Sequence, residues 1–335
     1  MPSRDPSWWA PVFVLAPARS LSSVVTAMIG QHPQLHSFPE LSLFRAEYTD
    51  QLLVDPPGWL GSPSRNRVGG LLRALAQSHD GKQDEESIER ALEWLTARKD
   101  WPVALVLDHL LAGVAPLVGV EKSPENSGRD SFLQRMTSSY PRARYVHLVR
   151  HPVTTVRSMH GAWSTRGWWR VEPELFNQFC WSLWYFQHKR IADFGKTLPP
   201  DRFIRVRAED LANRPDEFLP PLCRWLGVDA SAEAVSCMKF PERSAYAALG
   251  PSNARGGADL SFLGSPSLRL AELPEGLSPP DDWTLDPWSV LMVHRLATEL
   301  GYGEADPSDG SLRAAEAPET VPPGGADARE PAALP

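Results

Sequence analysis

The sequence predicts an α/β fold with three layers, in which helices cover both faces of a central parallel sheet. Four short apolar runs have the composition of strands that are buried on both faces, and segments with helical periodicity lie between them. Strands that alternate with helices pair in parallel, and α/β proteins bind ligands at the carboxyl ends of such strands. We therefore expect the functional residues in the loops that follow the strands.

The four expected strands cover residues 12–15, 116–120, 144–149 and 203–207. A helix with apolar positions from Leu21 to Ile29 follows the first strand, and a long amphipathic helix is expected at 174–198. Between the first two strands, a helical insertion of about residues 45–115 interrupts the alternation. The insertion is expected to pack over the core.

The chain is expected to form one domain over residues 1–302, followed by a disordered tail over 303–335 that is rich in proline, alanine and acidic residues. Lys and Arg number 34 against 41 Asp and Glu, so the formal net charge is −7, which disfavours nucleic acid and anionic membranes as partners. No run approaches about 18 apolar residues, and the three cysteines lack metal-ligand spacing. We expect a cytoplasmic protein without a metal; the sequence does not predict its oligomeric state.

The segment "APARSLSSVV" after the first strand is the first candidate site. The backbone amides at the start of the following helix, the hydroxyls of Ser20, Ser22 and Ser23, and the guanidinium of Arg19 are suited to hold a terminal phosphate. The alternative is that the serines only cap the helix. The segment alone does not decide between the two.

The second candidate site is "YVHLVRHPVTTVRSM". Arg150 leaves the end of a strand, Pro152 suits the first turn of a helix, and Ser158 follows eight residues after Arg150. Arg150 and Ser158 are placed to meet at a second phosphate; the alternative is that Arg150 pairs with a nearby carboxylate. The Walker pattern of magnesium-dependent kinases and GTPases is absent, because the only "GKT" lacks the earlier glycine and ends a helix.

Taken together, the two segments resemble those of the sulfotransferases that use 3′-phosphoadenosine 5′-phosphosulfate (PAPS), in the group with an arginine-type "PRSGTT" loop that includes tyrosylprotein and polyketide-associated enzymes. The similarity continues in "GQHPQLHSFPEL", "EKSPEN", "RVRAEDLANRP" and "LATELGY". It implies a P-loop-like sulfotransferase fold. The implied enzyme transfers a sulfuryl group from PAPS to a hydroxyl of a small-molecule or carrier-tethered metabolite in secondary metabolism, with adenosine 3′,5′-bisphosphate (PAP) as product.

The resemblance also implies which residues bind the nucleotide. The residues at the 5′-phosphosulfate are Arg19, Ser20, Leu21, Ser22 and Ser23, those at the 3′-phosphate are Arg150 and Ser158, and those in a basic segment that closes over the nucleotide are Arg255 and Gly256. For this last segment, a disordered surface loop is the alternative.

The sequence departs from the family pattern at three positions: Leu21 replaces a loop glycine, Ala18 a proline, and Ala208 the aromatic residue of "YEDL". Leucine would be strained at positive φ. The helical pattern that starts at Leu21 predicts instead that this residue has helical dihedrals, and that its amide faces the same small volume as the side chains of Arg19, Ser22 and Lys122.

Four residues are implied in catalysis: Glu40, Lys122, Arg19 and His36. Glu40 stands where tyrosylprotein enzymes carry a glutamate that accepts the proton of the acceptor hydroxyl; the alternative is that it caps a helix over residues 41–48. Lys122 would neutralise charge that develops during transfer. His36 and Glu125 are reserve bases, with a turn residue and a surface carboxylate as their alternative roles.

Trp163, Trp168 and Trp169 are expected either to line an aromatic acceptor pocket or to pack a lid against the core. Two other functions stay open. A nucleotide kinase or other phosphoryl transferase would need ATP and magnesium. A protein that binds PAP without catalysis would have Leu21 as a sign of lost activity.

Overall fold

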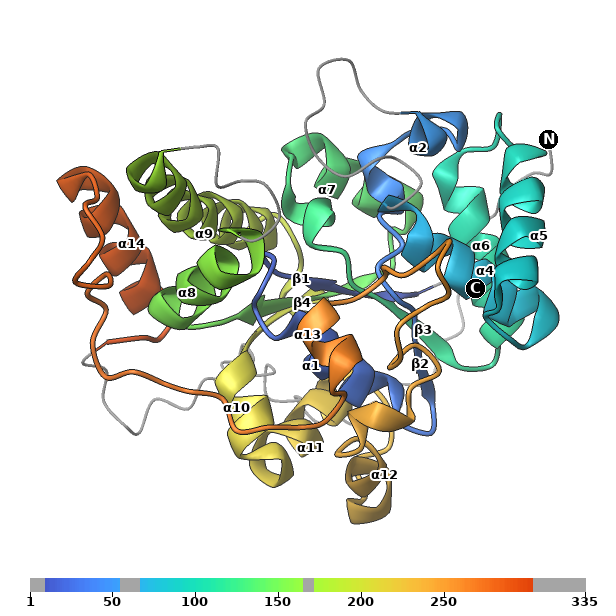
Figure 1. The fold of residues 1–335 in the computed structure, drawn as a ribbon. Helices are drawn as coiled ribbons and strands as arrows, with labels where there is room; N and C mark the ends of the chain where they lie inside the picture. Colours follow the sequence, from blue (N-terminus) through green and yellow to red (C-terminus); the bar gives the residue numbers. More distant parts are fainter. Residues whose placement is uncertain (1–9, 55–66, 165–171, 304–335) are drawn as a thin grey trace, which may run out of the picture.

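The computed structural model describes residues 10–54, 67–164 and 172–303, and Figure 1 shows their arrangement. A five-stranded sheet crosses the middle of the molecule, with helices on both of its faces. The expected α/β fold with three layers is confirmed. The tail beyond residue 303 and the residues Trp168 and Trp169 lie outside the described residues, and the division into one domain and a tail stays a prediction.

All neighbouring strands are parallel, in the order β2-β3-β1-β4-β5. The strands are β1 (Val12–Leu15), β2 (Leu35–Ser37), β3 (Val118–Glu121), β4 (Arg144–Val149) and β5 (Phe203–Arg207). The chain leaves β1 toward β2 on one side and later crosses from β3 to β4 on the other. The end of β1 is therefore the switch point at which open α/β sheets bind ligands.

Alternate residues of β1 pack into two different apolar cores, which explains why its sequence is apolar without interruption. Val12 and Val14 belong to one core and Phe13 and Leu15 to the other. The first face carries α1 (Ser22–Gly30), α10 (Ala208–Asn213), α11 (Pro215–Leu226) and α12 (Ala232–Cys237). The second carries α4 (Gly69–Asp80), α5 (Glu85–Thr96), α6 (Val103–Val114), α7 (Asp130–Ser139) and α9 (Pro173–Gly195).

A third core joins α9 to α8 (Pro152–Trp163) and α14 (Pro287–Glu299). The indoles of Trp181 and Trp184 are fully buried in it. Burying a large apolar side chain contributes about 1.5–3 kcal/mol, so this core fixes α8 against the end of β4.

Most of the described residues between 45 and 115 are helical. Besides α4, α5 and α6 this insertion contains the short α2 (Asp50–Leu53); residues 55–66 are outside the described part. Asp84 caps α5 by accepting the Ser87 amide at 2.8 Å. The helix expected over 41–48 is reduced to one short 3-10 turn, Leu43–Arg45.

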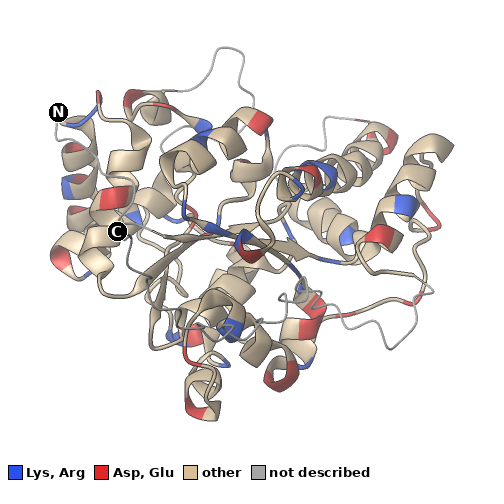
Figure 2. Cartoon of the chain, turned by 180° about the vertical axis from the view of Figure 1, so that it is seen from behind, with Lys and Arg blue, Asp and Glu red and all other residues tan. Residues whose placement is uncertain are grey.

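The segment from residue 244 to 286 contains a single short helix, α13 (Leu260–Gly264). In Figure 1 its orange trace runs across the front of the sheet, over the start of α1. Among the described residues, no helix is long and apolar enough to span a bilayer. Basic and acidic residues are interspersed along helices on both sides of the sheet (Figure 2).

Candidate active site

A cavity of about 520 Å³ lies at the carboxyl end of β1, between the start of α1, the second half of α8 and the segment 258–272. Seven residues implied by the resemblance line it: Arg19, Leu21, Ser22, Ser23, Glu40, Arg150 and Ser158. Glu125 and Trp163 line it too. The cavity wall therefore brings together residues from the two sequence motifs, which lie more than a hundred positions apart.

The backbone of Leu21 contradicts the prediction made for it. Leu21 has φ 57° and ψ 14°, a left-handed conformation, and Arg19 has φ 66°. The chain turns from β1 into α1 within a few residues, and Leu21 stands at the N-cap, before the first helical residue. Its side chain still packs against the same core as the apolar side chains of α1. Leu21 therefore fits the helical spacing of apolar residues although it precedes the helix.

The serines of the loop do not cap α1. The N-cap position makes no hydrogen bond from a side chain, and the Ser23 hydroxyl accepts from Lys122 Nζ at 3.1 Å and from the Asp259 amide at 2.9 Å. Ser20 is fully buried, and its hydroxyl has no partner among the described residues. The start of α1 thus keeps the amides and dipole that suit an anion.

Arg19 and Arg150 are joined at the mouth of the loop. Arg19 Nε donates to the Ser158 hydroxyl at 3.0 Å, and Arg150 Nη1 donates to the Arg19 carbonyl at 2.6 Å. Arg150 is therefore held by a backbone oxygen. The alternative prediction was that it pairs with a nearby carboxylate. Burial lowers the pKa of Arg150, and its Nε has no partner among the described residues.

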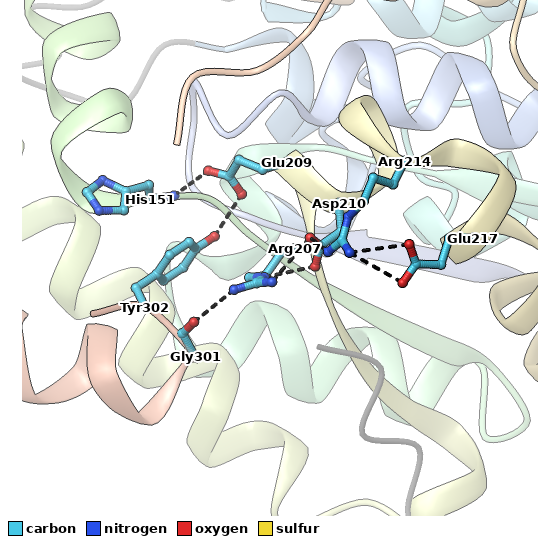
Figure 3. A network of polar contacts seen from close by, with 8 residues as sticks. All are labelled: His151, Arg207, Glu209, Asp210, Arg214, Glu217, Gly301 and Tyr302. Carbon is cyan, nitrogen blue, oxygen red and sulfur yellow. Dashed lines mark hydrogen bonds and ion pairs between the residues drawn. The ribbon is translucent and has the colours of Figure 1, made fainter. Parts of the chain in front are cut away.

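Two neighbouring groups fix the backbone of Arg150 (Figure 3 shows one of them). The Trp184 indole donates to the Arg150 carbonyl at 3.0 Å. Glu209, from the "AEDL" segment, accepts the His151 amide at 2.8 Å and the Tyr302 hydroxyl at 2.9 Å. Burial raises the pKa of Glu209. Glu209 of the "AEDL" segment thus helps to fix the backbone next to Arg150.

Glu40 and Lys122 form an ion pair at the cavity wall. Lys122 Nζ lies 2.5 Å from Glu40 Oε1, and the lysine is almost completely buried. The short 3-10 turn that follows has Ser42 as its N-cap, without a side-chain capping hydrogen bond, and the Glu40 carboxylate is held by Lys122 instead. Ser42 itself donates its hydroxyl to Glu125 at 3.2 Å, so a second carboxyl group lies beside the pair.

Sequence reasoning missed Glu121, which organises the backbone around this pair. Its buried carboxylate accepts from the Ser123 hydroxyl, from Asn126 Nδ2 at 2.6 Å and from the Leu41 amide. Ser123 in turn accepts the Ser42 amide at 2.8 Å. Burial raises the pKa of Glu121 to about 7. Glu121 directly follows the apolar residues of β3. A carboxylate at the end of a buried strand was the one feature of the sequence that could have indicated its role.

Three of the remaining predicted residues lie away from the cavity. His36 is in β2, between the rings of Phe38 and Tyr246, where burial lowers its pKa. Arg255 is exposed, and the Gly256 carbonyl accepts from Arg73 at 3.1 Å. None of them is a lining residue.

In the same part of the chain, the residues just after Gly256 line the cavity instead, together with Arg269. No group of three potential ligands for a metal ion occurs among residues 10–54, 67–164 and 172–303.

An open parallel sheet with two arginines, three serines and an uncapped helix start at its switch point is an arrangement suited to binding phosphate groups. The comparisons with known proteins give the family. The chain belongs to the sulfotransferase family, whose model matches residues 11–232, and it is a sulfotransferase.

Two solved structures show the same fold. The sulfotransferase domain from the curacin biosynthetic pathway has a TM-score of 0.70 and 22% identity, with 90% of this chain and 99% of that chain covered. The sulfotransferase domain from the Synechococcus PCC 7002 olefin synthase has a TM-score of 0.64 and 26% identity, with 88% and 98% covered. No curated protein sequence matches. The predicted family, fold and enzyme class are confirmed, and no finding supports the phosphoryl transferase.

Proposed function

We propose that the cavity binds PAPS and that the enzyme transfers its sulfuryl group to a hydroxyl of a small-molecule or carrier-tethered metabolite. The observation that carries the proposal is the Lys122–Glu40 pair. Glu40 lines the same cavity as Arg19 and Arg150, and Lys122, behind it, donates to Ser23 at the start of α1. A base, a cation and an anion site are thereby combined in one volume.

The residues fit a nucleotide with two separate phosphates. The buried Ser20 hydroxyl and the Arg150 Nε lack partners among the described residues, and the first turn of α1 offers free amides. In the proposed arrangement, Arg19 and the start of α1 hold the 5′-phosphate, while Arg150 and Ser158 hold the 3′-phosphate. PAPS supplies an activated sulfuryl group.

Glu40 is the proposed base and Lys122 the proposed cation. In the proposed step the Glu40 carboxylate, held in place by Lys122, accepts the proton of the acceptor hydroxyl. The acceptor oxygen forms a bond to sulfur as the bond between sulfur and the phosphate oxygen breaks. Lys122 and Arg19 then stabilise the negative charge that remains on the leaving phosphate.

The cavity wall also carries apolar side chains that an organic acceptor could contact. Trp163, Leu260 and Phe262 line the cavity, as do the carboxyl groups of Glu40 and Glu125. The similarity to sulfotransferase domains of a biosynthetic pathway and of an olefin synthase supports a biosynthetic acceptor. The three cysteines are free thiols, which is consistent with the reducing cytoplasm. We propose no metal for the reaction.

The first test is a thermal-shift titration with PAP, with and without magnesium, and with ATP and magnesium as the comparison. PAP is expected to stabilise the protein in both buffers. No stabilisation at millimolar PAP would contradict the proposal, and stabilisation by ATP with magnesium alone would favour a phosphoryl transferase.

Glu40→Gln is expected to keep the shift with PAP and to lower transfer of labelled sulfate from PAPS by roughly 10²–10⁴-fold, because the amide cannot accept the proton. The exposed Glu47→Gln serves as the matched control and keeps both properties. Transfer by Glu40→Gln at the wild-type rate would remove Glu40 as the base.

A further inference from the structure

A carboxylate of the chain itself is bound to the main phosphate-binding arginine of the cavity. Asp259 forms an ion pair with Arg19 Nη1, while Arg19 Nη2 donates to the Ser261 hydroxyl at 3.3 Å and Nε to Ser158 at 3.0 Å. Every nitrogen of this guanidinium therefore has a partner before any ligand enters. The positive charge that a phosphate would use is already neutralised.

Asp259 is fixed in this place by two further contacts. Its amide donates to the Ser23 hydroxyl at 2.9 Å, and its carboxylate caps α13 by accepting the Ser261 amide at 2.9 Å. The side chains of Arg19 and Asp259 are 15% and 26% exposed. An ion pair that is shielded to this degree is stronger than one on an open surface.

The position of Asp259 conflicts with a bound nucleotide. A phosphate that meets Arg19 and Ser23 would lie within a few ångströms of this carboxylate, where like charges repel in a partly desolvated site. The Arg19 nitrogen that binds the Asp259 carboxylate also cannot give the same hydrogen bond to a phosphate at once. One of the two anions has to leave.

We propose that Asp259 is an internal competitor of the nucleotide, which holds the place of a phosphate at Arg19 in the free enzyme and leaves it when the nucleotide binds. The proposal rests on the proposed nucleotide site and adds a regulation of that site. The segment 258–272, which lines the cavity and is joined to the loop through these contacts, is released together with Asp259. The affinity for PAP is then lower than the phosphate contacts alone would give.

The test is a calorimetric titration of PAP into the full-length wild type, Asp259→Asn and Asp259→Ser. Asparagine and serine are both good N-cap residues, so α13 keeps its cap while the competing charge is removed. We expect the Kd for PAP to fall at least fivefold in both variants. The control is Asp286→Asn, which removes an equal charge from the capping residue of α14, at the Ser289 amide, and should leave the Kd within twofold.

The outcomes separate the two proposals. If the wild type binds PAP and both Asp259 variants bind it equally well or more weakly, Asp259 belongs to the binding site or to the fold, and the competitor is excluded. If none of the proteins binds PAP, the proposed nucleotide site itself is wrong, and the competitor fails with it. A gain in only the Asp259 variants supports the inference.

Discussion

Leu21 has a left-handed backbone conformation, which glycine adopts most easily. It lies in the loop between β1 and α1. A left-handed conformation costs a residue with a side chain about 1–3 kcal/mol, and Leu21 recovers part of this by packing its side chain against the core under the sheet. The loop glycine of the similar enzymes therefore stands at a position that has positive φ in this chain. The helical pattern of the sequence gave no sign of this conformation.

Replacing Leu21 by glycine and by alanine separates the strain from the packing. Both variants lose the leucine side chain, but only alanine keeps the Cβ that disfavours positive φ. We expect Leu21→Gly to be more stable than Leu21→Ala by about 1 kcal/mol in urea unfolding. Equal stability of the two variants would show that the backbone strain is relieved in another way.

Some of the residues at the cavity could be predicted from the sequence because of their positions after strands. Arg19 and Arg150 lie in the loops after β1 and β4, and Ser22, Ser23 and Ser158 lie in the helices that follow these loops. The strand ends of a parallel sheet converge, which brings such loops together. The contacts of Asp259 with Arg19 and Ser23 could not be predicted, because they join positions more than two hundred residues apart through an irregular segment. His36 was misplaced because a strand was not expected there.

At the scale of secondary structure, strand length decided which elements could be predicted. β1, β4 and β5 lie where expected, since each is a continuous apolar or alternating run. β2 has three residues, with His36 in the middle, and is an edge strand that pairs with β3. Hydrogen bonds of the sheet, rather than its own sequence, hold such a short strand.

Glu121 joins three elements: the end of β3, the loop of Glu40 and the turn of Asn126. Because burial raises its pKa to about 7, the folded state keeps a proton between pH 5 and 7 that the unfolded chain has already released. The folded state binds more protons in this range, so the contribution of Glu121 to stability decreases as the pH rises.

The variant Glu121→Gln removes this titration and leaves the other groups in place. We expect the free energy of unfolding of the wild type to decrease by roughly 2 kcal/mol relative to Glu121→Gln between pH 5 and pH 7. The measurement is urea unfolding of both proteins at four pH values. A constant difference across this range would mean that the carboxylate is already ionised at pH 5.

For the molecule as a whole, the end of the described chain is tied to the second motif. Tyr302 is buried, and its hydroxyl donates to Glu209, which also accepts the amide of His151 next to Arg150 (Figure 3). Arg207 donates to the Gly301 carbonyl at 2.9 Å in the same network. The last helix, α14, is thereby connected with the phosphate side of the cavity.

Tyr302→Phe is expected to lower the free energy of unfolding by about 1–3 kcal/mol, since the buried Glu209 carboxylate loses one of its donors. Tyr48→Phe, at a ring that is 39% exposed, is the control and should change it by less than about 0.5 kcal/mol. Chemical denaturation of the two variants tests this. Equal effects of the two variants would exclude Glu209 as a strong acceptor of the Tyr302 hydroxyl.

Close contact of three backbones also connects the helical insertion with the loop of the proposed base, Glu40. A Cβ added to Gly70, in the first turn of α4, would lie 2.1 Å from the Glu40 carbonyl and 2.8 Å from Gly257, whose own carbonyl accepts the Glu40 amide at 2.7 Å. Not even a methyl group fits between the insertion, the loop of the proposed base and the segment before Asp259. The position of α4 is therefore linked to the position of the proposed base, and we expect a shift of α4 to displace the Glu40 loop.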